Sequence, residues 1–258
     1  MKIYDTFMFF NEYDLLEIRL NTLDKVVDKF VLVESNKTFN NDDKEFNYEK
    51  NKERYAKFQD KIIHIKVEEH PDFTNAWSFE HYQRNHILKG IKEAQDEDII
   101  IIADVDEIPN PKTLNPILTH ANTIKDLKVI IFNQYEFYYY LNNLRKNIWT
   151  GTKVCHKKLF EDYTPQQVRC NVEGKNYKDA GWHFSYLGGK EAVKLKLQSF
   201  SHQEYNNEET FNKIENSLDK GVDMFERQIP NKFIPISDIH PQYIIDNQDK
   251  YKHLIKKL

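Results

Sequence analysis

The chain contains 258 residues, of which 40% are hydrophobic, 14% aromatic and 30% charged. This composition excludes a small disulfide-stabilised scaffold and an intrinsically disordered chain, because enough apolar residues are present to form a core. Lysine and arginine number 37 against 41 aspartates and glutamates, a formal net charge of -4. That balance argues against nucleic acid as a partner, because binding to a phosphate backbone normally requires a basic surface.

Cysteine content and the amino terminus bear on the compartment. Cys155 and Cys170 form neither a C-x-x-C motif nor the spacing of a zinc site, and we interpret them as ordinary thiols. The amino terminus does not have the pattern of a signal peptide, and no apolar run of about eighteen residues predicts a membrane span. We therefore expect a cytoplasmic protein without a membrane span. The sequence leaves its oligomeric state open.

In residues 1–110, apolar runs alternate with stretches of helical periodicity, which is the pattern of strands joined by crossover helices. We predict strands at 3–10, 29–34, 62–67 and 99–102, helices at 15–23 and 77–94, and a polar loop followed by a helix at 36–57. This alternation predicts the α/β fold class.

Residues 111–258 are less regular. We predict one strand that opens at 129–132 and continues through 135–140, another at 181–186, and helices at 190–197 and 208–220, the last of them stopped by Gly221. No internal repeat or Gly/Ser linker is present, so we expect residues 1–258 to form a single domain.

The most informative segment is the apolar run 99–102 with the acidic residues Asp104, Asp106 and Glu107 after it. A β-branched run is typical of a parallel strand buried on both faces, and ligands bind at the carboxyl ends of such strands. Asp104 and Asp106 point to the same side of the strand and together can hold one Mg²⁺ or Mn²⁺ ion that also binds phosphate. Arg84, on the preceding helix, can supply a guanidinium, so that the cation and the guanidinium flank one bound diphosphate. The alternative is a solvated turn, because acidic residues before a proline are common in loops.

These residues also carry a resemblance to known enzymes. Gln83-Arg84-Asn85, Gly90 and the strand that ends in Asp104-Val105-Asp106 resemble the nucleotide-sugar half of fold-A (GT-A) glycosyltransferases. More narrowly, four segments resemble glycosyltransferase family 17 and occur in the order that the family has: 4–12, 30–35, 104–109 and 180–183. The tail 243–254 is also similar to that family. The best-known members of that family are β-1,4-mannosyl-glycoprotein 4-β-N-acetylglucosaminyltransferases, which add bisecting GlcNAc.

The resemblance implies a GT-A fold, with a Rossmann-like, mostly parallel mixed sheet flanked by helices. Its donor-binding half would cover about 1–110 and its acceptor-side half about 111–258. It implies metal-dependent, inverting transfer of a sugar from a UDP-sugar to a hydroxyl of a glycan acceptor, with GlcNAc as the first candidate for the sugar. The implied cofactors are Mn²⁺ or Mg²⁺ and the UDP-sugar donor.

Carried over residue by residue, Asp104 and Asp106 match the D-x-D motif that binds the cation and the ribose-diphosphate, and Arg84 matches the donor-side arginine. His183, in Gly181-Trp182-His183, is the candidate for the protein's second metal ligand. The alternative for His183 is a buried histidine bound to a backbone carbonyl. His202 is the reserve candidate.

Two more residues are candidates for donor binding. Lys196, with Lys190 in second place, follows His183 and is predicted to reach the β-phosphate of the leaving UDP. The alternative is a solvated lysine on a helix face. Glu34, at the end of its strand, is predicted to contact the uridine or ribose, or else only to terminate the strand.

A single-displacement transfer also needs a general base. Asp179 stands just before the candidate metal histidine and is the first candidate, and Glu107 is the second. The alternative for Glu107 is to orient Asp106 or cap the following turn. Four further residues are candidates for lining an acceptor groove: Trp77, Glu80, Tyr138 and Trp149. The alternative is that these side chains pack in the core.

Two other functional classes compete with the transferase. A metal-dependent phosphohydrolase also uses acidic clusters at strand ends, but it usually needs more ligands to hold a second metal. A non-catalytic sugar-binding module would explain the aromatic content. The set Asp104, Asp106 and His183 argues against that module.

Overall fold

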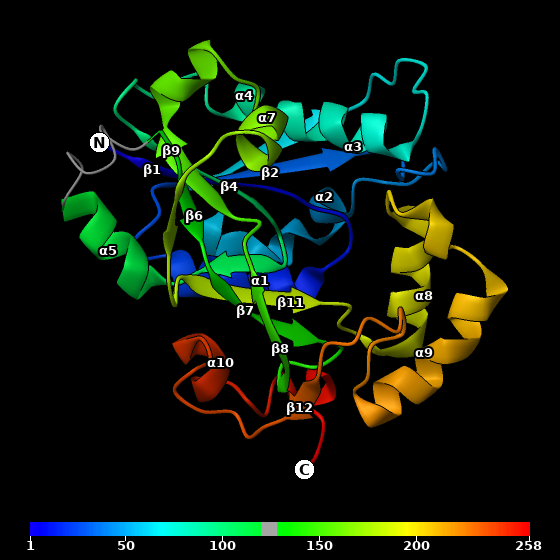
Figure 1. Cartoon of the computed structure of the whole chain (residues 1–258). Coiled ribbons are helices and arrows are strands. Elements are labelled where there is room, and N and C mark those ends of the chain that lie inside the picture. Colours follow the sequence, from blue (N-terminus) through cyan, green and yellow to red (C-terminus); the bar gives the residue numbers. More distant parts are fainter. Residues whose placement is uncertain (120–127) are drawn as a thin grey trace.

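The computed structural model describes residues 1–119 and 128–258, and within these ranges the strands form two sheets (Figure 1). The larger sheet has the order β10-β6-β9-β4-β1-β2-β3. Its strands are β1 (Ile3–Met8), β2 (Lys29–Ser35), β3 (Ile62–Val67), β4 (Ile99–Asp104), β6 (Ile130–Phe132), β9 (Lys153–His156) and β10 (Lys175–Tyr177). The smaller sheet has the order β12-β8-β7-β11-β5. Its strands are β5 (Glu107–Pro109), β7 (Gln134–Tyr138), β8 (Asn143–Trp149), β11 (Gly181–Ser185) and β12 (Asn231–Phe233).

Helices connect and cover the strands (Figure 1). The α-helices are α1 (Tyr13–Leu23), α2 (Asn47–Asn51), α3 (Ala76–Asn85), α4 (Ile87–Gly90), α5 (Pro111–Thr119), α7 (Pro165–Cys170), α8 (Gly189–Ser199), α9 (Glu208–Lys220) and α10 (Gln242–Asp246). Short 3-10 segments cover Lys52–Phe58, Lys157–Glu161, Gln203–Tyr205 and Lys252–Leu254. None of the helices in the described ranges is long and apolar enough to cross a membrane.

The larger sheet confirms the predicted α/β class with a mostly parallel sheet. Strands β3, β2, β1 and β4 are all parallel, and only β9 runs antiparallel to its neighbours β4 and β6. The run at β4 is buried on both faces: Ile99 and Ile101 pack in one hydrophobic cluster, Ile100 and Ile102 in another. A continuous β-branched run therefore reflects two covered faces, because successive side chains point to opposite sides.

Helix α1 lies between the two sheets. Leu16 and Leu20 pack in the cluster that includes Ile99 of the larger sheet. Leu15 and Ile18 pack in the cluster formed by the smaller sheet and the carboxyl-terminal segment. The predicted helical periodicity at 15–23 is confirmed, and its apolar residues serve two layers.

The predicted continuous strand through 129–140 is wrong. The chain breaks at Asn133, so that β6 joins the larger sheet and β7 the smaller one. The backbone N–H of Asn133 donates to the carbonyl of Tyr177, the last residue of β10, and its carbonyl accepts from the N–H of Ala180, just before β11. Two apolar runs separated by one residue look like one strand in the sequence, whereas their hydrogen-bond partners differ. The predicted helix 77–94 is likewise divided at His86 into α3 and α4.

A fully buried ion pair fixes the turn that carries the acidic motif. Arg19 on α1 and Asp5 on β1 are both 0% exposed, with Nη2 and Oδ1 2.5 Å apart. The Nη1 of the same guanidinium donates to the backbone carbonyls of Asp104 at 3.0 Å, Val105 at 3.3 Å and Glu107 at 2.6 Å. Arg19 thus ties the turn after β4 to the helix between the sheets.

Replacing Arg19 with methionine is expected to lower the free energy of unfolding by about 3–5 kcal/mol, because the Asp5 carboxylate is left buried without its counter-charge. Denaturant titration measures the loss. Arg54→Met is the matched control, since Arg54 also pairs with Asp14 and Glu17 but is 33% exposed. That control should lose no more than about 1 kcal/mol. Equal losses would contradict a special role of the buried pair.

Candidate functional site

A cavity of about 450 Å³ lies where the carboxyl ends of β1 and β4 face α3, α8 and the smaller sheet. Both halves of the chain line it. Five of the residues predicted to bind the donor or the cation are among the lining side chains: Arg84, Asp104, Asp106, His183 and Lys196. The structure therefore brings the acidic motif together with the cationic and imidazole groups proposed to work with it.

Asp104 is held by two guanidinium groups. Arg84 on α3 donates from Nη2 to Oδ1 at 3.0 Å, and Arg169 on α7 donates from Nη2 to Oδ2 at 2.7 Å. The Asp104 side chain is 31% exposed, whereas that of Arg84 is 2% and that of Arg169 is 9% exposed. Arg84 is fixed in turn by Glu80 one helical turn earlier, at 2.8 Å. Asp104 thus presents its carboxylate at the cavity wall within an ordered set of charges.

Asp106 is more deeply buried and has different partners. Its Oδ2 accepts from Lys196 Nζ at 2.9 Å, and its Oδ1 lies 3.7 Å from His183 Nε2. Burial alone would raise the pKa of Asp106, but the charges of Lys196 and His183 outweigh it and lower the pKa. Burial would likewise lower the pKa values of Lys196 and His183, and the Asp106 carboxylate raises both. The three groups form one charged cluster in the wall of the cavity.

His183 is packed under an aromatic ring. Trp149 stacks on its imidazole, with ring centroids 4.2 Å apart. Nδ1 of His183 is buried and has no hydrogen-bond partner in the described structure. The alternative of a histidine satisfied by a backbone carbonyl is therefore not what the structure shows, and Nε2 faces Asp106.

The residues present fit a divalent cation that binds together with a diphosphate. Carboxylates and imidazole are ligands that Mn²⁺ accepts, and Asp106 and His183 already face each other. In the described part of the chain no three His, Cys, Asp or Glu side chains gather as a complete metal cage. Cations of this kind are commonly held by one or two carboxylates together with substrate phosphates, so a complete cage is not required.

Glu107 is a structural carboxylate in this fold. It is 0% exposed and does not line the cavity. Its oxygens accept from Arg169 at 2.6 and 2.9 Å, from Trp149 Nε1 at 2.6 Å, from Thr152 Oγ1 at 3.2 Å and from the Asp104 backbone N–H at 3.2 Å. With both oxygens occupied in this way, Glu107 fixes the D-x-D turn at the backbone of Asp104, whereas the alternative given above was that it orients Asp106 or caps the following turn.

Glu34 and Asp179 lie outside the cavity lining. Glu34 is fully buried and accepts from the backbone N–H groups of Asn47 and Tyr48, so it caps the start of α2. Asp179, at positive φ, accepts from the Tyr135 hydroxyl at 2.8 Å. The structure places neither carboxylate with the D-x-D cluster. Lys190 also points elsewhere, to Glu215 at 2.9 Å.

Six charged cavity residues were not predicted from the sequence: Glu12, Lys37, Lys44, Glu136, Arg169 and Arg227. Glu136 lies on β7 and Arg169 on α7, neither of which was predicted with its observed bounds. Glu12 does follow a predicted strand, and that position was a signal that could have found it. Trp77, Glu80, Tyr138 and Trp149, the predicted groove residues, all line the cavity, as does His202.

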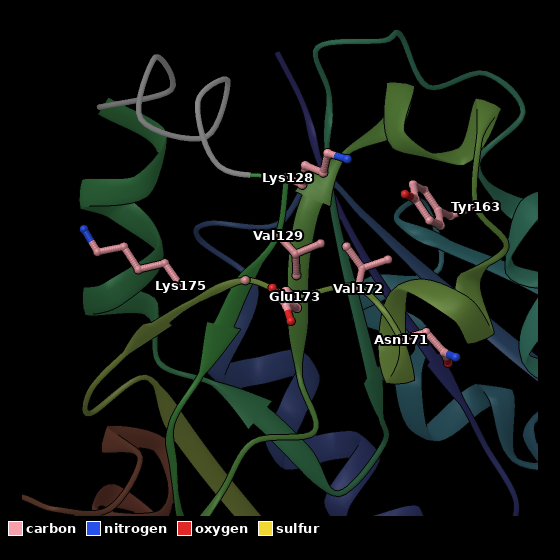
Figure 2. A pocket seen from close by; sticks show the side chains of 8 residues that line it. Lys128, Val129, Tyr163, Asn171, Val172, Glu173 and Lys175 are labelled. Carbon is pink, nitrogen blue, oxygen red and sulfur yellow. The ribbon is translucent and has the colours of Figure 1, made fainter.

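A second hollow lies away from these residues, beside β6 and the segment that follows α7 (Figure 2). Figure 2 shows Lys128 and Val129 on one side of it and Tyr163, Asn171 and Val172 on the other. None of the residues predicted to bind or react lines this hollow.

Comparison with known proteins identifies relatives of the chain. Residues 1–257 match Glycosyltransferase family 17. The β-1,4-mannosyl-glycoprotein 4-β-N-acetylglucosaminyltransferase of Rattus norvegicus is 20% identical over 284 aligned residues, which cover 95% of this chain and 53% of the rat protein. The chain thus spans about half the length of that relative.

Similar solved structures are remote. S. aureus TarS has a TM-score of 0.47 and 13% identity, covering 88% of this chain and 74% of that chain. A mannosyltransferase from Pyrobaculum calidifontis in complex with GDP-Man and Mn²⁺ has a TM-score of 0.39 and 13% identity, and the match covers 62% of this chain and 46% of the mannosyltransferase chain. The family match over almost the whole chain confirms the resemblance noted in the sequence. The chain belongs to Glycosyltransferase family 17.

Proposed function

We propose that this glycosyltransferase moves GlcNAc from UDP-GlcNAc to a hydroxyl group of a glycan, with inversion at the anomeric carbon and with Mn²⁺ or Mg²⁺ as cofactor. The observation that carries the proposal is the cavity in which Asp104 and Asp106, at the end of a buried strand, meet Arg84, Lys196 and His183. Family membership and the named activity of the rat relative support the sugar.

In this proposal Asp104, Asp106 and His183 would hold the cation, which would supply positive charge to the leaving diphosphate. Arg84 and Lys196 also supply positive charge to the leaving diphosphate. Their side chains are fixed by Glu80 and Asp106, so that their charges need little rearrangement as negative charge develops on the diphosphate. The glycan occupies the part of the cavity nearer the smaller sheet.

We assign the general base to Glu136 in place of Asp179 or Glu107. Glu136 lines the cavity and is the direct partner of His183 in the β7–β11 pair, so the two side chains share one face of the smaller sheet. Its Oε2 accepts from Asn147 at 2.6 Å, and no residue of the described ranges donates a hydrogen bond to Oε1. A carboxylate oxygen with this freedom, beside the cation site, can accept the proton of a sugar hydroxyl.

Release of UDP in the absence of an acceptor tests the proposal. The chain is incubated with Mn²⁺ and, separately, with UDP-GlcNAc, UDP-GalNAc, UDP-glucose, UDP-galactose and GDP-mannose, and free nucleotide is measured. We expect slow hydrolysis of UDP-GlcNAc that stops when EDTA is added. Release from another donor alone would reassign the sugar. If the chain neither releases nucleotide from any of these donors nor binds any of them, the proposed transferase activity is overturned and a sugar-binding module is favoured.

A further inference from the structure

Arg169 has no role in the activity proposed above. It lies near the end of α7, lines the cavity and uses one nitrogen, Nη2, to donate to both Asp104 and Glu107. Burial disfavours its charge, but the neighbouring carboxylates of Asp104 and Glu107 outweigh burial and raise its pKa further. Arg169 is therefore a permanent cation placed against the D-x-D motif.

The pairing of Asp104 conflicts with cation binding. Arg84 donates to Oδ1 and Arg169 to Oδ2, so a cation that takes Asp104 as a ligand competes with two guanidinium groups for its oxygens. If Arg169 gives up Asp104 it keeps Glu107 as its counter-charge, but a buried N–H of Nη2 loses its acceptor, which is unfavourable unless another acceptor replaces it. A diphosphate meets that need, since its oxygens accept bidentate hydrogen bonds from arginine.

Arg169 is built to change partners over a short distance. Its Nη1 donates separately to Glu107 Oε2 at 2.9 Å, and Glu107 is immobilised by Trp149 and Thr152. α7 is docked to α3 by the Gln166 backbone N–H, which donates to Asn85 Oδ1 at 3.1 Å. The hydrogen of Nη2 that points to Asp104 can therefore pass to a ligand in the cavity, while Nη1 and the other hydrogen of Nη2 stay bonded to Glu107.

We propose that Arg169 is a diphosphate-binding residue that exchanges partners: it holds Asp104 in the ligand-free chain and binds the nucleoside diphosphate once a divalent cation has taken Asp104. The inference rests on the proposed function, which makes Asp104 a cation ligand. Its consequence is reciprocal coupling, because each ligand removes an obstacle to the other. The cation alone and UDP alone bind weakly, and together they bind tightly.

The substitution Arg169→Gln tests the exchange through two affinities that change in opposite directions. Mn²⁺ binding without nucleotide is measured by electron paramagnetic resonance, and UDP binding at saturating Mn²⁺ by calorimetry. The variant should bind Mn²⁺ alone at least about threefold more tightly, because a competitor for Asp104 is gone. It should bind UDP with Mn²⁺ about tenfold or more weakly, because a charged hydrogen bond to the diphosphate is lost.

Two further variants complete the test. Arg54→Gln removes a guanidinium that also bridges two carboxylates, Asp14 and Glu17, outside the cavity, and should change neither affinity. Arg169→Lys keeps the charge without the fork and should bind UDP with an affinity between those of the wild type and Arg169→Gln. A fall in both affinities of Arg169→Gln, or no change in either, would overturn the exchange. A wild-type chain that binds no UDP in the presence of Mn²⁺ would instead overturn the proposed function itself.

Discussion

Asp106→Asn is expected to reduce sugar transfer from UDP-GlcNAc at least about 100-fold. The substitution keeps the size of the side chain but removes a buried negative charge that Lys196 and His183 both face. Without it, the cation loses a ligand and Lys196 loses the partner that holds it at the cavity wall. Loss of one preorganised electrostatic contact at a developing charge typically lowers the rate by this amount or more. Steady-state kinetics with UDP-GlcNAc and a glycan acceptor measure the loss.

Asp179→Asn is the matched control for that experiment. It is the same chemical change at an aspartate that lies outside the cavity and accepts a hydrogen bond from Tyr135. We expect close to wild-type transfer, which would also remove Asp179 from the candidates for the general base. Full activity in Asp106→Asn, with folding verified by circular dichroism, would contradict the proposed role of Asp106. A large loss in Asp179→Asn would restore the base assigned from the sequence.

Glu136→Gln is expected to lower the turnover number for transfer about 10²–10⁴-fold, the usual contribution of a general base. UDP affinity should change little, because Glu136 makes no hydrogen bond or ion pair with Arg84, Lys196 or Asp106 in the described structure. Transfer kinetics and UDP calorimetry on the same preparation separate the two effects. A base acts on the acceptor, so the variant should bind the nucleotide and fail in the chemistry.

Glu12→Gln is the control for this second substitution, because Glu12 is another carboxylate of the same cavity. Burial raises the pKa of Glu12, and one of its oxygens accepts from the backbone N–H groups of Phe10 and Asn11 at 3.1 Å. We expect its loss to affect transfer less than the loss of Glu136. If the order is reversed, Glu12 is the base and the assignment to Glu136 is wrong.

The central part of the fold could be predicted because its signals are local. The run at 99–102 is typical of a strand buried on both faces, and the spacing of the apolar residues at 15–23 is typical of a helix, and both patterns can be recognised without the rest of the chain. The strands predicted at 29–34 and 62–67 match β2 and β3 to within one residue. The later strands are short, and their partners are distant in sequence, so periodicity could neither separate β6 from β7 nor assign them to different sheets.

The site divides in the same way. The sequence by itself determined the family and the D-x-D motif at a strand end, because both can be recognised in short segments and in the order of those segments along the chain. Only the tertiary structure decided that Arg169, 65 residues away, pairs with Asp104, and that Glu107 is turned into the interior. Only the register of β7 against β11 brings Glu136 beside His183. The physical reason is that a side chain's charge partners depend on how distant strands and helices pack, whereas burial and strand formation follow from local patterns of polarity.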